Sequence, residues 1–241
     1  MLSERLQCIV EAVGRAECVL DVGTDHGYVP IALIQNGQSE RAIASDISTS
    51  SLQKTKKQIT HRGITGIETR LGFGLDIIAP GECDAIVIAG MGGLLVADIL
   101  LKGKIKLGHH FHLVLQPMNN VQTVRLALEA IGARLILEKM VFEDGHYYQI
   151  MAAEPGKMQI STPIDYWIGL ADIREENKTF EEFVHHLIQK EKHILVQVSA
   201  INTDGARRKW HQSQGMLDML KEVVARDRKS TRLNSSHPAG S

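Results

Sequence analysis

The sequence predicts an α/β fold, namely a mainly parallel sheet with helices on both faces, followed by a C-terminal antiparallel helical hairpin. Five short apolar runs alternate with helix-like segments between residues 18 and 131, as in parallel sheets. Two further apolar runs flank Glu143-Asp-Gly-His146, which indicates a β-hairpin. Beyond residue 165 the apolar residues recur at three and four positions, the period of an amphipathic helix.

Each strand of the parallel part is a short apolar run. The first, Cys18-Val-Leu-Asp-Val22, stops at Gly23, and the fifth stops at Pro117. The run Asp84-Ala-Ile-Val-Ile-Ala89 is the clearest of them. The expected strands cover residues 18–22, 42–46, 67–71, 84–89 and 111–116, and the expected hairpin strands cover 134–142 and 147–153.

Helices are expected between the strands and after the hairpin. Ser48 or Thr49 is placed to cap the second helix, and Asn202-Thr-Asp-Gly205 marks the turn between the two C-terminal helices. A parallel sheet with one antiparallel strand near its edge is the usual form of the Rossmann-like class I methyltransferase fold, whereas Rossmann dehydrogenases usually lack the reversed strand. The expected helices cover residues 28–35, 48–61, 92–101, 121–131, 180–201 and 206–225.

The composition is that of an ordinary globular protein. The chain has 241 residues, 44% hydrophobic and 23% charged, and a net charge of −1, which neither indicates nor excludes a nucleic-acid partner. It has no apolar stretch of the roughly 20 residues that span a membrane and no signal-peptide pattern. The widely spaced Cys8, Cys18 and Cys83 favour neither disulfides nor a metal site, and the histidines of residues 109–112 lack partners at ligand spacing. We therefore expect a cytoplasmic protein without a metal.

The chain is expected to form two domains and a tail. Residues 1–155 hold the strands of the α/β domain, and residues 156–226 form the helical coiled-coil domain. The segment from Asp227 to His237 matches one reading frame of a common sequencing-library adapter. Because this segment is also polar, we expect residues 227–241 to be a non-native, disordered tail.

The strongest local sign of a ligand is Gly23-Thr-Asp-His-Gly27, which follows the first strand. Ligands of parallel sheets bind at the carboxyl ends of the strands, and glycines let the backbone approach a ligand closely. The spacing is Gly-x-x-x-Gly, not the Gly-x-Gly-x-x-Gly that holds a dinucleotide pyrophosphate. It therefore favours a ligand without pyrophosphate, such as S-adenosylmethionine. The alternative is an ordinary glycine turn.

Further candidates follow the next three strands. Asp46 is placed to accept hydrogen bonds from two ribose hydroxyls, or else to cap the next helix. Gly72-Phe-Gly74 is suited to packing under an adenine ring. Ala89-Gly-Met-Gly-Gly93 has small residues where a substrate base or methyl donor must pass, although Gly92 and Gly93 would equally form a tight turn before a helix.

Together these motifs resemble the TrmK family, bacterial methyltransferases that modify N1 of adenine 22 in tRNA. The resemblance covers residues 1–226 and is carried by Asp21-Val-Gly-Thr-Asp-His-Gly-Tyr28, Ile86-Val-Ile-Ala-Gly-Met-Gly-Gly93 and Leu113-Val-Leu-Gln-Pro117. It implies a Rossmann-like methyltransferase domain followed by a small coiled-coil domain, with S-adenosyl-L-methionine as cofactor and tRNA as partner. No membrane or metal is implied, and a monomer is favoured. Phe73 and Met118 depart from the family, which has an aspartate and an asparagine there.

The resemblance also implies roles for individual residues. The expected cofactor-binding residues are Asp21, Gly23, Asp46, Ile47, Gly72, Phe73, Gly74, Ala89, Gly90 and Met91. The expected substrate-binding residues are Gly92, Gln116, Pro117 and Asn119, together with the basic side chains Lys57, Arg207 and Arg208, which otherwise belong to solvated helix faces.

The implied reaction suggests a catalytic group. N1 of neutral adenine carries a lone pair, so methyl transfer needs no prior deprotonation, but the product is cationic until N6 loses a proton. The protein must position N1 and stabilise the developing charge. Asp25 is the candidate carboxylate, with His26 and Tyr28 orienting it or contacting the base. The alternative for Asp25 is a helix cap.

Two other functions are compatible with the residues. One is a nucleotide- or RNA-binding module that keeps the fold but has weak or no turnover, which Phe73 and Met118 favour. The other is an NAD-dependent oxidoreductase, against which the missing dinucleotide motif and the closing hairpin argue.

Overall fold

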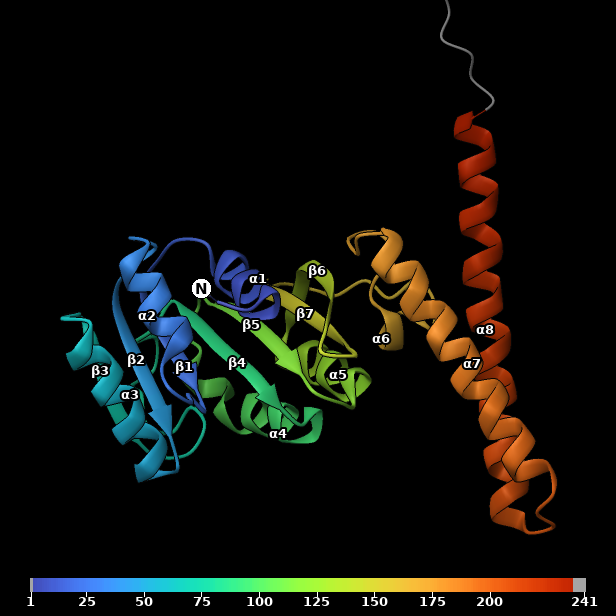
Figure 1. Ribbon diagram of the computed structural model, residues 1–241, viewed down its shortest axis with the longest axis horizontal. Helices are drawn as coiled ribbons and strands as arrows, with labels where there is room; N and C mark the ends of the chain where they lie inside the picture. The colour runs from blue at the N-terminus through green and yellow to red at the C-terminus, as the bar shows by residue number, and fades with distance from the viewer. Residues whose placement is uncertain (1, 236–241) are drawn as a thin grey trace, which may run out of the picture. The chain divides into compact units, whose positions relative to one another are not determined.

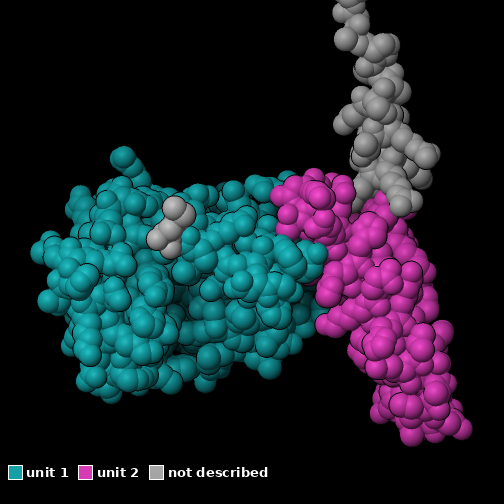
Figure 2. Space-filling model, viewed as in Figure 1, with its two compact units in different colours: residues 1–175 teal, residues 176–241 magenta. Residues whose placement is uncertain are grey.

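The computed structural model describes the backbone of residues 2–235 and the side chains of residues 2–226. It divides into two compact units, residues 1–175 and 176–241 (Figure 2). The first unit is built on a seven-stranded sheet in the order β3-β2-β1-β4-β5-β7-β6 (Figure 1), in which only β7 runs antiparallel to its neighbours. The strands are β1 (Ala16–Val22), β2 (Ser39–Asp46), β3 (Ile67–Leu71), β4 (Ala85–Met91), β5 (His112–Pro117), β6 (Ala133–Glu143) and β7 (His146–Pro155). The predicted Rossmann-like sheet with one reversed strand is confirmed.

Helices alternate with the strands as expected, with a short 3-10 helix at Lys104–Lys106 and two additional α-helices. The first addition, α1, buries Ile9, Val10 and Val13 on one face at helical spacing, but it lies before the first predicted strand and was not predicted. The second, α6, is a single turn of four residues. The helices of this unit are α1 (Glu4–Val13), α2 (Tyr28–Gln35), α3 (Thr49–His61), α4 (Gly93–Gly103), α5 (Val121–Ile131) and α6 (Asp165–Ile168).

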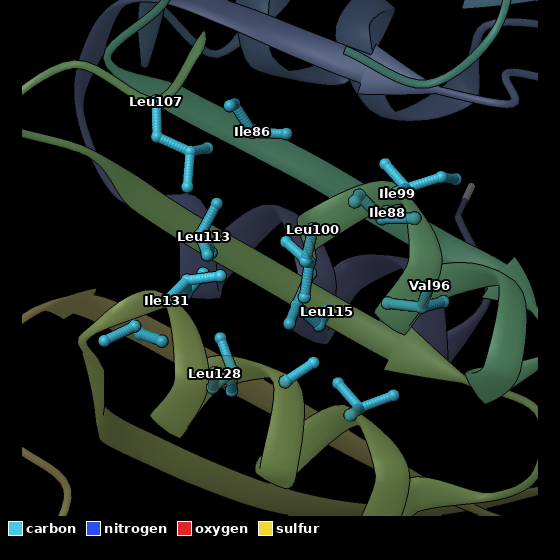
Figure 3. Close-up of a cluster of buried hydrophobic side chains, with 14 of the residues drawn as sticks. Ile86, Ile88, Val96, Ile99, Leu100, Leu107, Leu113, Leu115, Leu128 and Ile131 are labelled. Atoms are coloured by element: carbon cyan, nitrogen blue, oxygen red, sulfur yellow. The ribbon is translucent and has the colours of Figure 1, made fainter. Parts of the chain in front are cut away.

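The sheet is buried on both faces, and each face has its own core. Alternate residues of a strand point to opposite faces, so Ile86 and Ile88 of β4 enter one cluster while Val87 enters the other. Burial on both faces explains why β4 is an uninterrupted apolar run. The cluster under α4 and α5 (Figure 3) includes Ile86, Ile88, Val96, Ile99, Leu100, Leu107, Leu113, Leu115, Leu128 and Ile131.

A buried ionic cluster fixes the chain that follows the sheet. The guanidinium of Arg125, which is 1% exposed, donates to Glu138 Oε1 from Nε at 2.9 Å and to Gln149 Oε1 from Nη2 at 2.6 Å. Its Nη1 donates to the Tyr166 carbonyl at 2.9 Å, and Glu138 Oε2 accepts from the Leu170 amide. Arg125, Glu138 and Gln149, named here the Arg125 cluster, thus join α5, the β6–β7 hairpin and the segment around α6.

The second unit is a helical hairpin in which α7 (Lys178–Ser199) packs on α8 (Asp204–Ser235). Asn177 begins α7, because its side chain accepts a hydrogen bond from the Phe180 amide at 3.0 Å. The units divide at residues 175 and 176, and not near residue 155, because the intervening segment is tied to the sheet through the Arg125 cluster.

The end of α8 differs from the tail expected at residues 227–241. The backbone of residues 227–235 continues α8, since a helix that is already formed upstream extends at little cost through polar residues. Residues 236–241 lie outside the described part of the chain. The non-native origin of residues 227–241 stays a prediction.

Candidate active site

The loops singled out in the sequence meet at one edge of the sheet. The chain leaves β1 toward β2 and β3 on one side, whereas β4 and β5 lie on the other side, so the strand order reverses between β1 and β4. Ligands of such sheets bind in the crevice outside the carboxyl ends of the strands at this reversal. The loops that follow β1, β2, β3, β4 and β5 all begin at this edge, which we call the ligand edge.

The loop after β1 lies directly against the end of β4. Gly23 has a φ of +74°, and its amide and that of Thr24 each donate to the Ser45 carbonyl at 2.8 Å. A Cβ added at Gly23 would lie 2.0 Å from Met91 Cε. The positive φ is what favours glycine here, because Met91 Cε is the far end of a flexible side chain that can move aside.

Two polar groups beneath this loop are buried without full compensation. Burial raises the pKa of Asp21 to about 6, opposed by the Thr24 hydroxyl and reinforced by the charge of Asp46. The Thr24 hydroxyl is itself buried and has no hydrogen-bond partner of good geometry within the described residues. A buried hydroxyl without a partner and a desolvated carboxylate are destabilising by themselves. They fit a site that receives a polar, cationic ligand.

Asp46 is the last residue of β2. It lies at the ligand edge and also makes a hydrogen bond within the turn that leads into α3. Its Oδ1 accepts from the Ser48 amide at 2.6 Å, while Ser48 begins α3 by accepting from the Ser51 amide at 3.4 Å. Asp46 therefore does take part in the start of the helix, which was the alternative to ribose binding. That hydrogen bond uses Oδ1 and fixes the orientation of the carboxylate. Ile47, next to it, is 72% exposed.

The loops after β3 and β4 complete the expected cofactor side. A Cβ at Gly72 would lie 2.1 Å from Ile77 Cγ2, so the backbone there is tightly packed. Phe73 is 40% exposed, so its ring is not part of the hydrophobic core. Gly90 has a φ of +74° and open space around it. The ten expected cofactor-binding residues thus lie at the ligand edge, either among the last residues of β1, β2 and β4 or in the loops that follow β1, β2 and β3.

The expected catalytic residues also lie together. Asp25 is exposed, and its Oδ1 accepts from Lys54 Nζ at 3.2 Å while Oδ2 lies 3.7 Å from His26 Nε2. The His26 ring stacks on Tyr28, with 5.5 Å between ring centroids. The N-cap of α2 is Gly27, with no side-chain cap, so Asp25 does not fill the capping role considered as its alternative.

On the substrate side, the start of α4 is joined to the loop after β5. The Gly93 amide donates to the carbonyl and to Oδ1 of Asn119, each at 3.1 Å. A Cβ at Gly93 would lie 2.3 Å from the Asn119 carbonyl oxygen, so the tight turn considered for Gly92 and Gly93 is real. Asn119 supplies an amide beside Met118, which is 50% exposed.

The expected RNA contacts lie in different units. Lys57 is exposed on α3 in the first unit. Arg207 and Arg208 are exposed on α8 in the second, where Arg207 Nη2 lies 3.3 Å from Asp204 Oδ1.

The hydrogen bond between Arg5 and Gln116 was not predicted from the sequence. Gln116 is fully buried, and its Oε1 accepts from Arg5 Nη1 at 2.7 Å. Arg5 lies in α1, which was not predicted although its apolar residues have helical spacing. The Glu143-Asp-Gly145 turn meets it, because Glu143 accepts from the Arg5 amide at 3.0 Å.

No group of three or more metal-ligating side chains is placed to hold a metal ion within the described residues. None of the helices in residues 2–235 has the length and apolarity needed to span a bilayer.

Strand order, reversed strand and ligand edge together define a class I methyltransferase domain, and residues 2–151 match the model of a methyltransferase domain. The tRNA (adenine(22)-N(1))-methyltransferase of Bacillus subtilis (strain 168) is 34% identical over 92% of this chain and 97% of its own. The crystal structure of the B. subtilis m1A22 tRNA methyltransferase TrmK superposes with a TM-score of 0.84, at 34% identity over 93% of this chain and 99% of that one. The chain belongs to the TrmK family.

A third similarity concerns the cofactor. A Streptococcus pneumoniae putative tRNA (m1A22) methyltransferase, solved in complex with S-adenosyl-L-methionine, has a TM-score of 0.77 and is 29% identical over 90% of this chain and 100% of its own. Family membership favours the methyltransferase interpretation over an NAD-dependent oxidoreductase.

Proposed function

We propose that this protein transfers a methyl group from S-adenosyl-L-methionine to N1 of adenine 22 in tRNA. The observation that carries the proposal is the 34% identity to the B. subtilis tRNA (adenine(22)-N(1))-methyltransferase, which extends over 97% of that relative and so includes both compact units. The expected cytoplasmic location fits a tRNA substrate and stays a prediction. A monomer is the expected state and stays a prediction.

The ligand edge suits S-adenosyl-L-methionine, which supplies a methyl group on a positively charged sulfur. Asp46 at the end of β2 would accept hydrogen bonds from the ribose hydroxyls, and the backbone at Gly23 allows a close approach. A polar ligand would give the Thr24 hydroxyl a hydrogen bond of good geometry, and the Asp21 carboxylate would lie near a cationic ligand. Phe73, in place of the family aspartate, would stack on the adenine ring.

Asp25 would act on the substrate adenine. Lys54 and His26 hold its carboxylate at the ligand edge, where it would accept a hydrogen bond from the N6 amino group. As N1 takes the methyl group, the positive charge spreads toward N6, and a carboxylate there stabilises it and is placed to accept the N6 proton when the cationic product loses it. His26 and Tyr28, stacked on each other, would orient Asp25 or contact the base.

The target base must leave its stack before transfer. Met91 and Met118 at the ends of β4 and β5 would flank the slot that receives it. Lys57 in the first unit and Arg207 and Arg208 in the second would contact phosphates, which position the RNA without reading its sequence.

Phe73 and Met118 keep one alternative open, a module of the same fold with weak or no turnover. Both side chains are substantially exposed at the ligand edge, where the family has polar groups. The alternative requires donor and RNA binding without product.

The test is methyl transfer from isotopically labelled donor to unmodified tRNA, followed by nucleoside mass analysis. N1-methyladenosine is expected, and tRNA with guanine in place of adenine 22 is the matched control that should stay unlabelled. Label on the control RNA, or no label with donor binding intact, would contradict the proposed reaction.

A further inference from the structure

Arg5 of α1 makes contacts at the ligand edge that the proposed reaction has not used. Its side chain is only 22% exposed, although it lies in the first turn of the first helix. Nη1 donates to Gln116 Oε1 at 2.7 Å, and the guanidinium carbon lies 5.1 Å from the centroid of the Tyr148 ring. Arg5 Nε is buried with no hydrogen-bond partner of good geometry and lies 3.6 Å from Glu143 Oε1.

This contact fixes the orientation of the Gln116 carboxamide. Arginine has donors and no acceptor, so the atom that faces Arg5 must be the carboxamide oxygen. The NH₂ group must then lie on the other side, where it donates to the Pro117 carbonyl at 3.1 Å and contacts Met118 Sδ at 3.6 Å. The hydrogen bond from Arg5 thus fixes the Gln116 carboxamide in one orientation, with its NH₂ group directed toward the end of β5.

The same donor supports the loop that joins β5 to α5. Pro117 and Met118 begin this loop, and the Met118 amide donates to the Met91 carbonyl at 2.8 Å. One residue further, Asn119 receives the two hydrogen bonds of the Gly93 amide. The position of Gln116 is therefore transmitted to the ends of both β4 and β5, between which the substrate base is proposed to lie.

Arg5 also ties the tip of the β6–β7 hairpin to this point. Its amide donates to Glu143 Oε2 at 3.0 Å, and this hydrogen bond lowers the pKa of Glu143. Tyr148, which follows the tip, stacks under the guanidinium. Three segments far apart in the sequence, α1, the end of β5 and the hairpin, thus meet at Arg5.

We propose that Arg5 is a positioning residue for the target adenine: it holds the Gln116 carboxamide so that its NH₂ group donates a hydrogen bond to a ring nitrogen of the base. The inference rests on the proposed function. A thioether is a weak acceptor, and the half-exposed Met118 side chain is free to give way to a ring nitrogen, which is a stronger one. N1 must keep its lone pair for the methyl group, so the donor serves N3 or N7.

The test compares Arg5→Gln with Arg15→Gln, an exposed arginine just after α1 that serves as the matched control. With the full chain and unmodified tRNA, Arg5→Gln is expected to lower kcat at least tenfold, with donor Kd within twofold of the parent chain. Arg15→Gln is expected to change neither. Parental kcat in Arg5→Gln, or a loss of donor affinity equal to the loss of kcat, would overturn the positioning role.

A second variant covers the case in which Arg5→Gln does not fold. Gln116→Glu keeps an acceptor for Arg5 but removes the NH₂ group. It is expected to lower kcat at least tenfold while the variant still folds and binds the donor, and parental kcat would overturn the proposal. If the parent chain itself forms no N1-methyladenosine, it is the proposed function that fails, which distinguishes the two results.

Discussion

The Arg125 cluster and the ligand edge differ in whether their buried polar groups have hydrogen-bond partners within the protein. In the cluster, all three guanidinium nitrogens of Arg125 have acceptors within the first unit. At the ligand edge, the buried Thr24 hydroxyl has no hydrogen-bond partner of good geometry within the described residues, and burial raises the pKa of Asp21. The comparison separates stability from function: the cluster pairs its buried polar groups within the fold, whereas the ligand edge holds Thr24 and Asp21, which a bound ligand would pair better.

The largest effect is expected from breaking the cluster. Glu138→Ala leaves Arg125 buried without its carboxylate, and removing one partner of a buried ion pair lowers the free energy of unfolding by about 3–5 kcal/mol. Denaturant unfolding measures this change. The double variant Arg125→Met with Glu138→Leu should recover most of it, and a single variant as stable as the parent would show that the cluster is not what holds this region.

The second effect concerns rate alone. Asp25→Ala is expected to lower kcat by about 100-fold, in the range of lost general acid–base catalysis, while donor affinity and Tm stay near parental values. Asp25 is exposed, so its removal leaves no cavity in the core. Single-turnover transfer with donor in excess gives the rate, and calorimetry gives the affinity. A near-parental rate would remove Asp25 from the mechanism.

The third effect is a pH dependence of stability. The pKa of Asp21 in the folded chain is about 6, above its ordinary value of 3.8, so the folded state binds the proton more tightly. Stability is then lost as pH rises from about 4 through 6, by about 3 kcal/mol in total. Asp21→Asn should remove this slope and be more stable at pH 7, but bind the donor more weakly.

Unfolding at pH 4, 5, 6 and 7 for Asp21→Asn and the parent chain measures the effect. Parallel stability curves would show that Asp21 is not strained in the ligand-free state, and the contrast with the Arg125 cluster would then rest on Thr24 alone.

The smallest effect is expected at Asp46. Asp46→Ala should weaken donor binding by about 1–3 kcal/mol, the range for polar groups left without partners. Titration calorimetry with S-adenosyl-L-methionine measures it. Asp76→Ala is a suitable control because Asp76 is an exposed aspartate outside the expected cofactor-binding set. Equal donor affinity in both variants would exclude Asp46 from the site.

The two regions also differ in what the sequence reveals. Ligand-edge residues follow apolar strands at glycines, so their position can be predicted from strand ends alone. Arg125, by contrast, looks like an ordinary charge on an amphipathic helix, and nothing in its neighbourhood indicates Glu138 as its partner. The role of Arg5 was not predicted for the same reason. Its partners Gln116 and Glu143 lie 111 and 138 residues further along the chain. Pairings set by tertiary packing leave no local pattern.

The contact between Met91 and Gly23 has a thermodynamic consequence. The Met91 methyl group occupies the space that a side chain at Gly23 would fill, and the Met91 carbonyl accepts from the Met118 amide. A ligand that shifts the Met91 backbone would disturb both the donor loop and the loop proposed to hold the base. Affinities for donor and RNA would then be linked, and such a coupling would be reciprocal.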